Sequence, residues 1–153
     1  NIKMSATKLW RNSTHIPALI KVLEEGHTIT IPLHGNSMRP FLQNGRDKAE
    51  LVLANGQFEV GDVVLAKVTA GYFVLHRIIA IDNDDITLLG DGNLKNEYCR
   101  KSDVKAKAVK FFRKGSDKPE YLTGKKWKMY SSLWMKLYPI RRYLLFIFKF
   151  IGY

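Results

Sequence analysis

One serine and one histidine stand in local sequences that could support nucleophilic catalysis. Ser37 lies in the segment 35–40, GNSMRP, where glycine and proline favour a turn that exposes the hydroxyl. His76 lies in an otherwise apolar stretch, 73–81, that predicts a strand. A serine hydroxyl is nearly inert near neutral pH and needs an adjacent base to take its proton. The alternative interpretation is that Ser37 only shapes a turn and that His76 is a core histidine with satisfied hydrogen bonds.

Four short elements occur in order between residues 29 and 109: Ser-Met-x-Pro at 37–40, Gly-Asp-Val-Val at 61–64, His-Arg at 76–77 and Gly-Asp-x-Asn at 90–93. In this order they resemble the signal peptidases and, more distantly, the self-cleaving repressors that share their fold. The resemblance implies a serine peptidase with Ser37 as nucleophile and His76 as general base.

The residue type at the position of the general base differs between two branches of these peptidases. Bacterial-type signal peptidases and the repressors carry a lysine there, whereas the archaeal and endoplasmic-reticulum relatives carry a histidine followed by arginine. The pair His76-Arg77 is similar to the histidine-using branch. Histidine titrates near pH 6.5 and is neutral at working pH, whereas a lysine must first be desolvated.

The resemblance also places acidic residues at two positions. The first falls on Asp91, in the Gly-Asp turn, and the second on Glu97, where an aspartate is usual in that branch. Either carboxylate could accept the second imidazole N–H, hold its tautomer and stabilise the imidazolium ion. We therefore keep both Asp91 and Glu97 as candidates for orienting His76, with an ordinary Asp-Gly turn as the alternative interpretation of Asp91.

The oxyanion side of the site departs from the family pattern. Many signal peptidases carry a serine two positions before the nucleophile, and here that residue is Gly35. The Asn36 side chain or a backbone amide would have to replace its hydroxyl as an oxyanion donor. We expect Asn36, Met38 and Pro40 to form the substrate-binding and oxyanion part of the site.

The surrounding pattern predicts a mainly β (α+β) domain. Strands are expected at 27–33, 49–53, 62–69, 72–81, 86–89 and 104–112, separated by turns at 70–71 and 82–85. This pattern and the resemblance together predict a curled antiparallel sheet, or partly open barrel, of the signal-peptidase type. Residues 5–25 predict a helix that Gly26 ends and that Pro17 could divide in two. The expected organisation is an N-terminal helical segment (1–26), a β peptidase domain (27–122) and a C-terminal helical segment (123–153).

Positive charge is concentrated in the last third of the chain. Of the net charge of +11, residues 1–99 contribute −1 and residues 100–153 contribute +12. Residues 125–153 hold seven basic and no acidic residues, interleaved with aromatic side chains, and Pro139 predicts a division into two helices. Aromatic rings and cations suit the headgroup layer of a bilayer. Packing of these helices on the protein's own sheet, and binding to nucleic acid, are the alternatives we weigh against membrane contact.

These observations predict a serine endopeptidase that removes a leader or signal segment from a precursor polypeptide, without a cofactor or metal. We expect peripheral association with the bacterial inner membrane through residues 125–153, the positive-inside tendency favouring the cytoplasmic face.

His34, His76 and Asp91 could ligate zinc, but the sequence contains no close-spaced ligand pair. Cys99 is expected to be a buried small residue.

Two rival functions come from other classes. A self-cleaving DNA-binding regulator would need a DNA-binding domain, for which residues 5–25 are too short, and a lysine base. A non-catalytic peptide-binding protein would hold Ser37 and His76 too far apart to hydrogen-bond.

Overall fold

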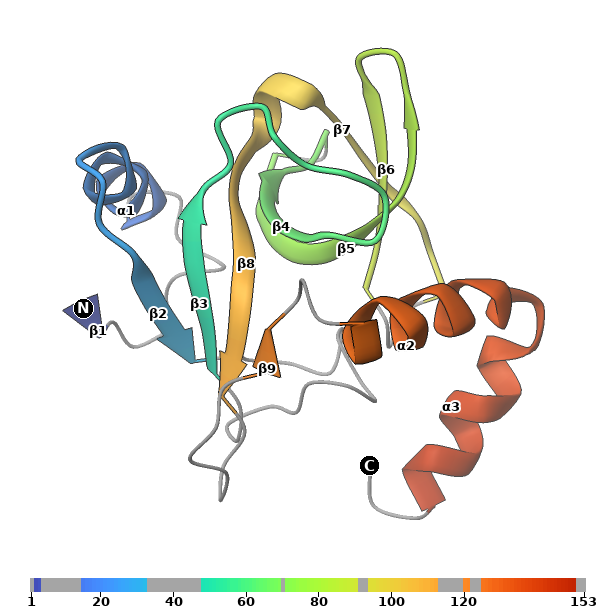
Figure 1. Cartoon of the computed structure of the whole chain (residues 1–153). Helices are drawn as coiled ribbons and strands as arrows, with labels where there is room; N and C mark the ends of the chain where they lie inside the picture. The colour runs from blue at the N-terminus through green and yellow to red at the C-terminus, as the bar shows by residue number, and fades with distance from the viewer. Residues whose placement is uncertain are drawn as a thin grey trace.

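The computed structural model describes residues 2–3, 15–32, 48–69, 71–90, 94–112, 120–121 and 125–150 (Figure 1). Its strands are β1 (Ile2–Lys3), β2 (Ile29–Pro32), β3 (Lys48–Leu53), β4 (Val63–Lys67), β5 (Phe73–Asp82), β6 (Asp85–Leu89), β7 (Glu97–Arg100), β8 (Val104–Phe112) and β9 (Glu120–Tyr121). Its helices are α1 (His15–Glu24), α2 (Lys125–Lys136) and α3 (Arg141–Phe150), with the short 3₁₀ turns η1 (Lys101–Asp103) and η2 (Tyr138–Ile140).

All the described strands belong to one sheet in the order β1-β2-β3-β8-β4-β5-β6-β7, with β9 beside β8. Every pairing is antiparallel except β1 with β2. The sheet curls without closing, and β4 and β5 are strongly bent (Figure 1). The prediction of a mainly β (α+β) fold built on a curled antiparallel sheet is confirmed.

Alternation of side chains divides the interior into two clusters, one on each face of the sheet. One contains Val63, Leu65 and Phe111 beneath α1, and the other contains Val64, Ile78 and Leu88. Helix α1 buries Ile16, Leu19 and Leu23, spaced as one helical face, against the first cluster. Burial of each such side chain contributes about 2 kcal/mol, so docking on the sheet stabilises this short helix far more than its intrinsic propensity does.

The structure describes the second part of the predicted N-terminal helix, and residues 5–14 lie outside the described residues. Helix α1 runs from His15 through Pro17 to Glu24, so Pro17 does not interrupt this part. Gly26 has a φ of 89°, the left-handed conformation that ends helices and that glycine adopts without strain.

The C-terminal segment forms two helices separated by the turn that contains Pro139, as predicted. Helix α2 packs through Trp127, whose ring centroid lies 5.0 Å from that of Phe111 on β8. Helix α3 leads away from the sheet at the lower right of Figure 1. Among the helices in the described part of the chain, none combines the length and hydropathy that crossing a bilayer requires.

Candidate active site

A buried histidine–glutamate pair joins β5 to β7, the last strand in the order of the sheet. Nδ1 of His76, on β5, lies 2.9 Å from Oε1 of Glu97, at the start of β7, and their side chains are only 7% and 15% exposed. The angles at Nδ1 do not meet those of a straight hydrogen bond, so the contact is a close approach of two polar atoms. The 2.9 Å separation is short enough for strong electrostatic coupling between the two groups.

The register of three strands explains how residues 21 positions apart meet. Leu88 on β6 pairs with Ile78 on one side and with Glu97 on the other, so these three side chains share a face of the sheet. His76 shares that face because it lies two residues from Ile78 on the same strand. In a flat sheet β5 and β7 would be about 10 Å apart, so the contact requires the curl of β6 and β7 over β5.

A second connection holds β7 over β5. Both the backbone N–H and the hydroxyl of Thr69, in the turn after β4, donate to the carbonyl oxygen of Tyr98, at 2.8 and 2.9 Å. Because Tyr98 directly follows Glu97, this bidentate contact restrains the carboxylate beside His76. No local sequence pattern marked Thr69 as part of the site.

The pair holds Glu97 in its ionised form. Contact with the His76 imidazole is the largest cause that lowers the pKa of Glu97 from its ordinary value of 4.5, and this outweighs the opposing effect of burial. A hydrogen bond with Tyr72 lowers the Glu97 pKa further, and the same bond is the largest cause that raises the pKa of Tyr72. Sequence reasoning missed Tyr72, although two-residue periodicity places it on the same strand face as His76.

The residue after the histidine has a different role. Arg77 points to the opposite face of β5, is 1% exposed, and donates to the carbonyl oxygen of Gly61 at 3.1 Å and to the hydroxyl of Ser131 on α2. Its guanidinium carbon lies 5.2 Å from the ring centroid of Trp127. Gly61 has a φ of 99°, and its N–H donates to the carbonyl of Ile78, so the Gly-Asp-Val-Val element is joined directly to the strand of His76.

Several predicted site residues lie outside the described residues. These are Ser37, Asn36, Met38 and Pro40, within 33–47, and Asp91, within 91–93. Of the predicted catalytic residues, the structure therefore places His76 and Glu97, and it brings those two together.

The remaining candidates have other surroundings. Cys99 is buried, as expected, and burial raises the pKa of its thiol to about 11. A thiol that holds its proton this firmly is a poor nucleophile. In the described ranges no three His, Cys, Asp or Glu side chains are grouped so that they could hold a metal ion.

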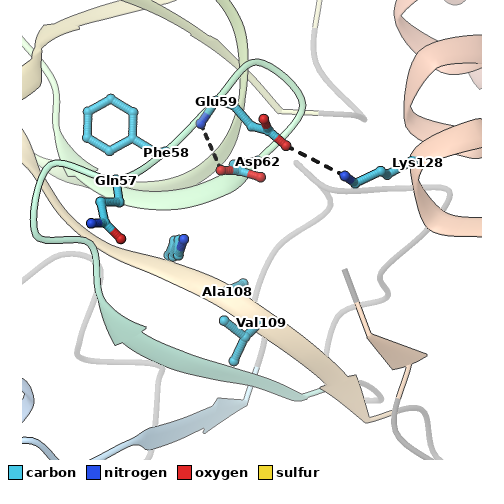
Figure 2. Close-up of a pocket in the computed structure, with 8 residues that line it drawn as sticks. Gln57, Phe58, Glu59, Asp62, Ala108, Val109 and Lys128 are labelled. Carbon is cyan, nitrogen blue, oxygen red and sulfur yellow. Dashed lines mark hydrogen bonds and ion pairs between the residues drawn. The ribbon is translucent and has the colours of Figure 1, made fainter. Parts of the chain in front are cut away.

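Figure 2 shows a pocket of about 310 Å³ between the loop before β4, strand β8 and helix α2. Its charged groups are of both signs: Lys128 Nζ lies 3.8 Å from Glu59 Oε1, and the Glu59 N–H donates to Asp62 at 2.9 Å (Figure 2). Neither His76 nor Glu97 lines it. The pocket thus lies where α2 meets the sheet, and it is separate from the histidine–glutamate pair.

Comparison with known proteins gives no family assignment. No protein-family model matches the chain, and no curated protein matches it significantly. Its function must therefore be inferred from its own residues and their geometry.

Proposed function

We propose that this chain is a serine endopeptidase of the signal-peptidase type that removes a leader or signal segment from a precursor polypeptide. Ser37 is the nucleophile and His76 is its general base. The observation that supports the proposal best is the buried contact, at 2.9 Å, between Nδ1 of His76 and the carboxylate of Glu97. A carboxylate on one nitrogen of an imidazole is the arrangement that prepares the other nitrogen for proton transfer.

Glu97 performs two tasks in this mechanism. It keeps the proton of the neutral imidazole on Nδ1, so that Nε2 accepts the proton of the Ser37 hydroxyl. It then stabilises the positive charge that develops on the ring. Its lowered pKa keeps the carboxylate ionised, which both tasks need.

The reaction proceeds in two balanced steps. The Ser37 oxygen attacks the scissile carbonyl carbon while its proton passes to His76, and the C–N bond then breaks as His76 returns that proton to the leaving amine. Water deprotonated by His76 next attacks the acyl-enzyme and releases Ser37 with its proton restored. No electron transfer, metal or cofactor enters either step.

The substrate class follows from the sheet and from the resemblance. An extended peptide can bind beside an exposed strand through main-chain hydrogen bonds, a mode that places few demands on side-chain sequence. Resemblance to signal peptidases adds a preference for small residues before the cleaved bond. The proposed substrate is thus an extended leader segment of a secreted protein or small precursor.

The decisive experiment compares Ser37→Ala with a matched serine variant on a panel of leader peptides, with products identified by mass spectrometry. Ser37→Ala is expected to lower the cleavage rate by roughly a thousandfold or more, because the nucleophile is lost. Ser132→Ala, at an exposed position on α2, is expected to cleave like the parent chain. Unchanged cleavage by Ser37→Ala would refute the proposal.

A parent chain that binds leader peptides but yields no product would instead support the non-catalytic peptide-binding function. Peptide binding by fluorescence anisotropy, measured alongside product formation, separates the two outcomes.

A further inference from the structure

Helix α2 has an unusual solvent-facing surface. Its sheet-facing side carries Trp127, Ser131 and Trp134, all buried. The opposite side, about half a turn away by helix geometry, carries the apolar side chains of Met129 and Leu133. These are 65% and 53% exposed, where a surface helix ordinarily presents polar groups.

Cations flank these apolar side chains. Lys125 and Lys136 are exposed and fall on the same side of α2 by helix geometry. The outer side of α2 is therefore amphipathic in its own right, with aliphatic groups between ammonium groups.

Helix α3 repeats the pattern. Arg141 points inward, is 1% exposed, donates to the carbonyl of Trp134 at 3.2 Å and lies over the rings of Trp134 and Tyr138. The opposite side of the helix carries Tyr143, Phe146 and Ile147, which are 63%, 62% and 53% exposed. Three large apolar groups at helical spacing face solvent on a helix whose main contacts are with the adjoining turn η2.

We infer that this face of the two helices docks on the surface of an anionic lipid bilayer. The α2–α3 face is defined by Met129, Leu133, Tyr143, Phe146 and Ile147. Aromatic and aliphatic side chains enter the boundary between headgroups and acyl chains, and the neighbouring cations pair with lipid phosphate and carboxylate groups. The helices lie on the bilayer and do not cross it, in keeping with their length.

Charge complementarity favours a lipid surface as the partner of this face over a second copy of the chain or nucleic acid. Residues 125–153 contain seven basic and no acidic residues, so two copies meeting through this face would bring like charges together. Nucleic acid would satisfy the cations but would leave the aliphatic groups exposed to water. An anionic bilayer accommodates both kinds of side chain.

Two contacts join the helices that carry the α2–α3 face to the proposed active site, one from the sheet-facing side of α2 and one from η2. Arg77, next to His76, donates to Ser131 on α2. The hydroxyl of Tyr138, in η2, donates to the carbonyl of Leu94 at 3.1 Å, three residues before Glu97. If the proposed peptidase function holds, docking keeps the site at the bilayer, and its substrates are precursors that are themselves held at the membrane.

The test is vesicle flotation of the full chain with phosphatidylcholine vesicles, with and without phosphatidylserine. We expect co-flotation with the anionic vesicles that decreases as salt is raised. The combined variant Met129→Ser, Leu133→Ser, Tyr143→Ser and Ile147→Ser is expected to bind about tenfold more weakly or worse. The variant Val60→Ser removes an apolar side chain that is 47% exposed outside the α2–α3 face, and it is expected to float like the parent.

Circular dichroism of each variant is the control for a retained fold. Equal flotation of the surface variant and the parent would overturn the inference. It would also be overturned by concentration-dependent dimerisation, or by binding to a DNA duplex, that replaced vesicle binding.

Flotation does not require catalysis, so Ser37→Ala is expected to float normally. Failure of the lipid inference is thereby separated from failure of the peptidase proposal.

Discussion

The guanidinium of Arg77 on strand β5 donates a hydrogen bond to the hydroxyl of Ser131 on helix α2, although 54 positions separate the two residues. Arg77 directly follows His76, so the strand that presents the proposed base on one face holds helix α2 with the other. The His-Arg pair of the sequence thus has two structural roles, one on each side of the sheet.

Replacement of Arg77 by lysine is expected to destabilise the protein by about 1–3 kcal/mol. An ammonium group cannot stack on Trp127 while reaching both Gly61 and Ser131 as the planar guanidinium does. Urea unfolding followed by tryptophan fluorescence measures the change. Arg142→Lys, at an exposed position, is the matched control and should leave the midpoint of urea unfolding unchanged. Equal unfolding midpoints for the two variants would contradict the structural role of Arg77.

Glu97 is expected to make folding stability dependent on pH in the acidic range. Its pKa is lower in the folded state than its ordinary value of 4.5, so its stabilising contribution is complete above that value and is lost as pH falls through the lower folded pKa. Glu97→Gln should therefore reduce the free energy of unfolding near neutral pH, and the difference from the parent should shrink at about pH 3. Urea titrations at both pH values test this, and a difference that stayed constant with pH would be the contrary result.

Tyr72→Phe is expected to raise the pKa of Glu97 without restoring its ordinary value. The hydrogen bond with Tyr72 contributes to the lowered pKa, but the contact with His76 is the larger cause and remains in this variant. Carboxyl carbon chemical shifts measured by NMR across the acidic range report the Glu97 pKa directly. His76→Asn should raise that pKa more than Tyr72→Phe does, and the reverse order would contradict the geometry of the pair.

Glu97→Gln is also expected to lower kcat for leader cleavage by roughly 10²–10⁴-fold with a smaller effect on KM. An amide in place of the carboxylate no longer stabilises the imidazolium ion and can hold the ring in the wrong tautomer. Glu59→Gln, which removes an exposed carboxylate from the pocket of Figure 2, should cleave at the parental rate. If Glu97→Gln kept the kcat of the parent chain, Glu97 would have no role in the mechanism.

Cys99 is expected to resist thiol reagents in the native state. With burial raising its pKa to about 11, only about one thiol in a thousand is ionised near pH 8, and the sulfur is shielded from solvent. Labelling with a chromogenic disulfide reagent should be slow in the native protein and rapid in urea. Rapid native labelling would show that β7, which carries Cys99, opens easily from the sheet.

Local sequence patterns were sufficient to predict much of the fold. A continuous apolar run predicted β5, and alternation of apolar and basic residues predicted β8, each to within a residue at each end. The difference arises because β5 is buried on both faces over most of its length, whereas β8 is buried on one. Pro139 predicted the division between α2 and α3 because proline cannot continue a helix. Strand β7 was missed: four residues with charged ends, Glu97 and Arg100, carry no clear periodicity.

The contact between His76 and Glu97 was decided by tertiary structure. The chain offered Asp91 and Glu97 as equal candidates, and Asp91 lies outside the described residues. Glu97 reaches His76 because β6 and β7 curl over β5 and because Thr69 holds Tyr98 in place. Strand curl depends on contacts between distant segments, so no local pattern encodes it. The sequence thus named the residue types that the chemistry needs, whereas folding brought the carboxylate of Glu97 to within 2.9 Å of the imidazole.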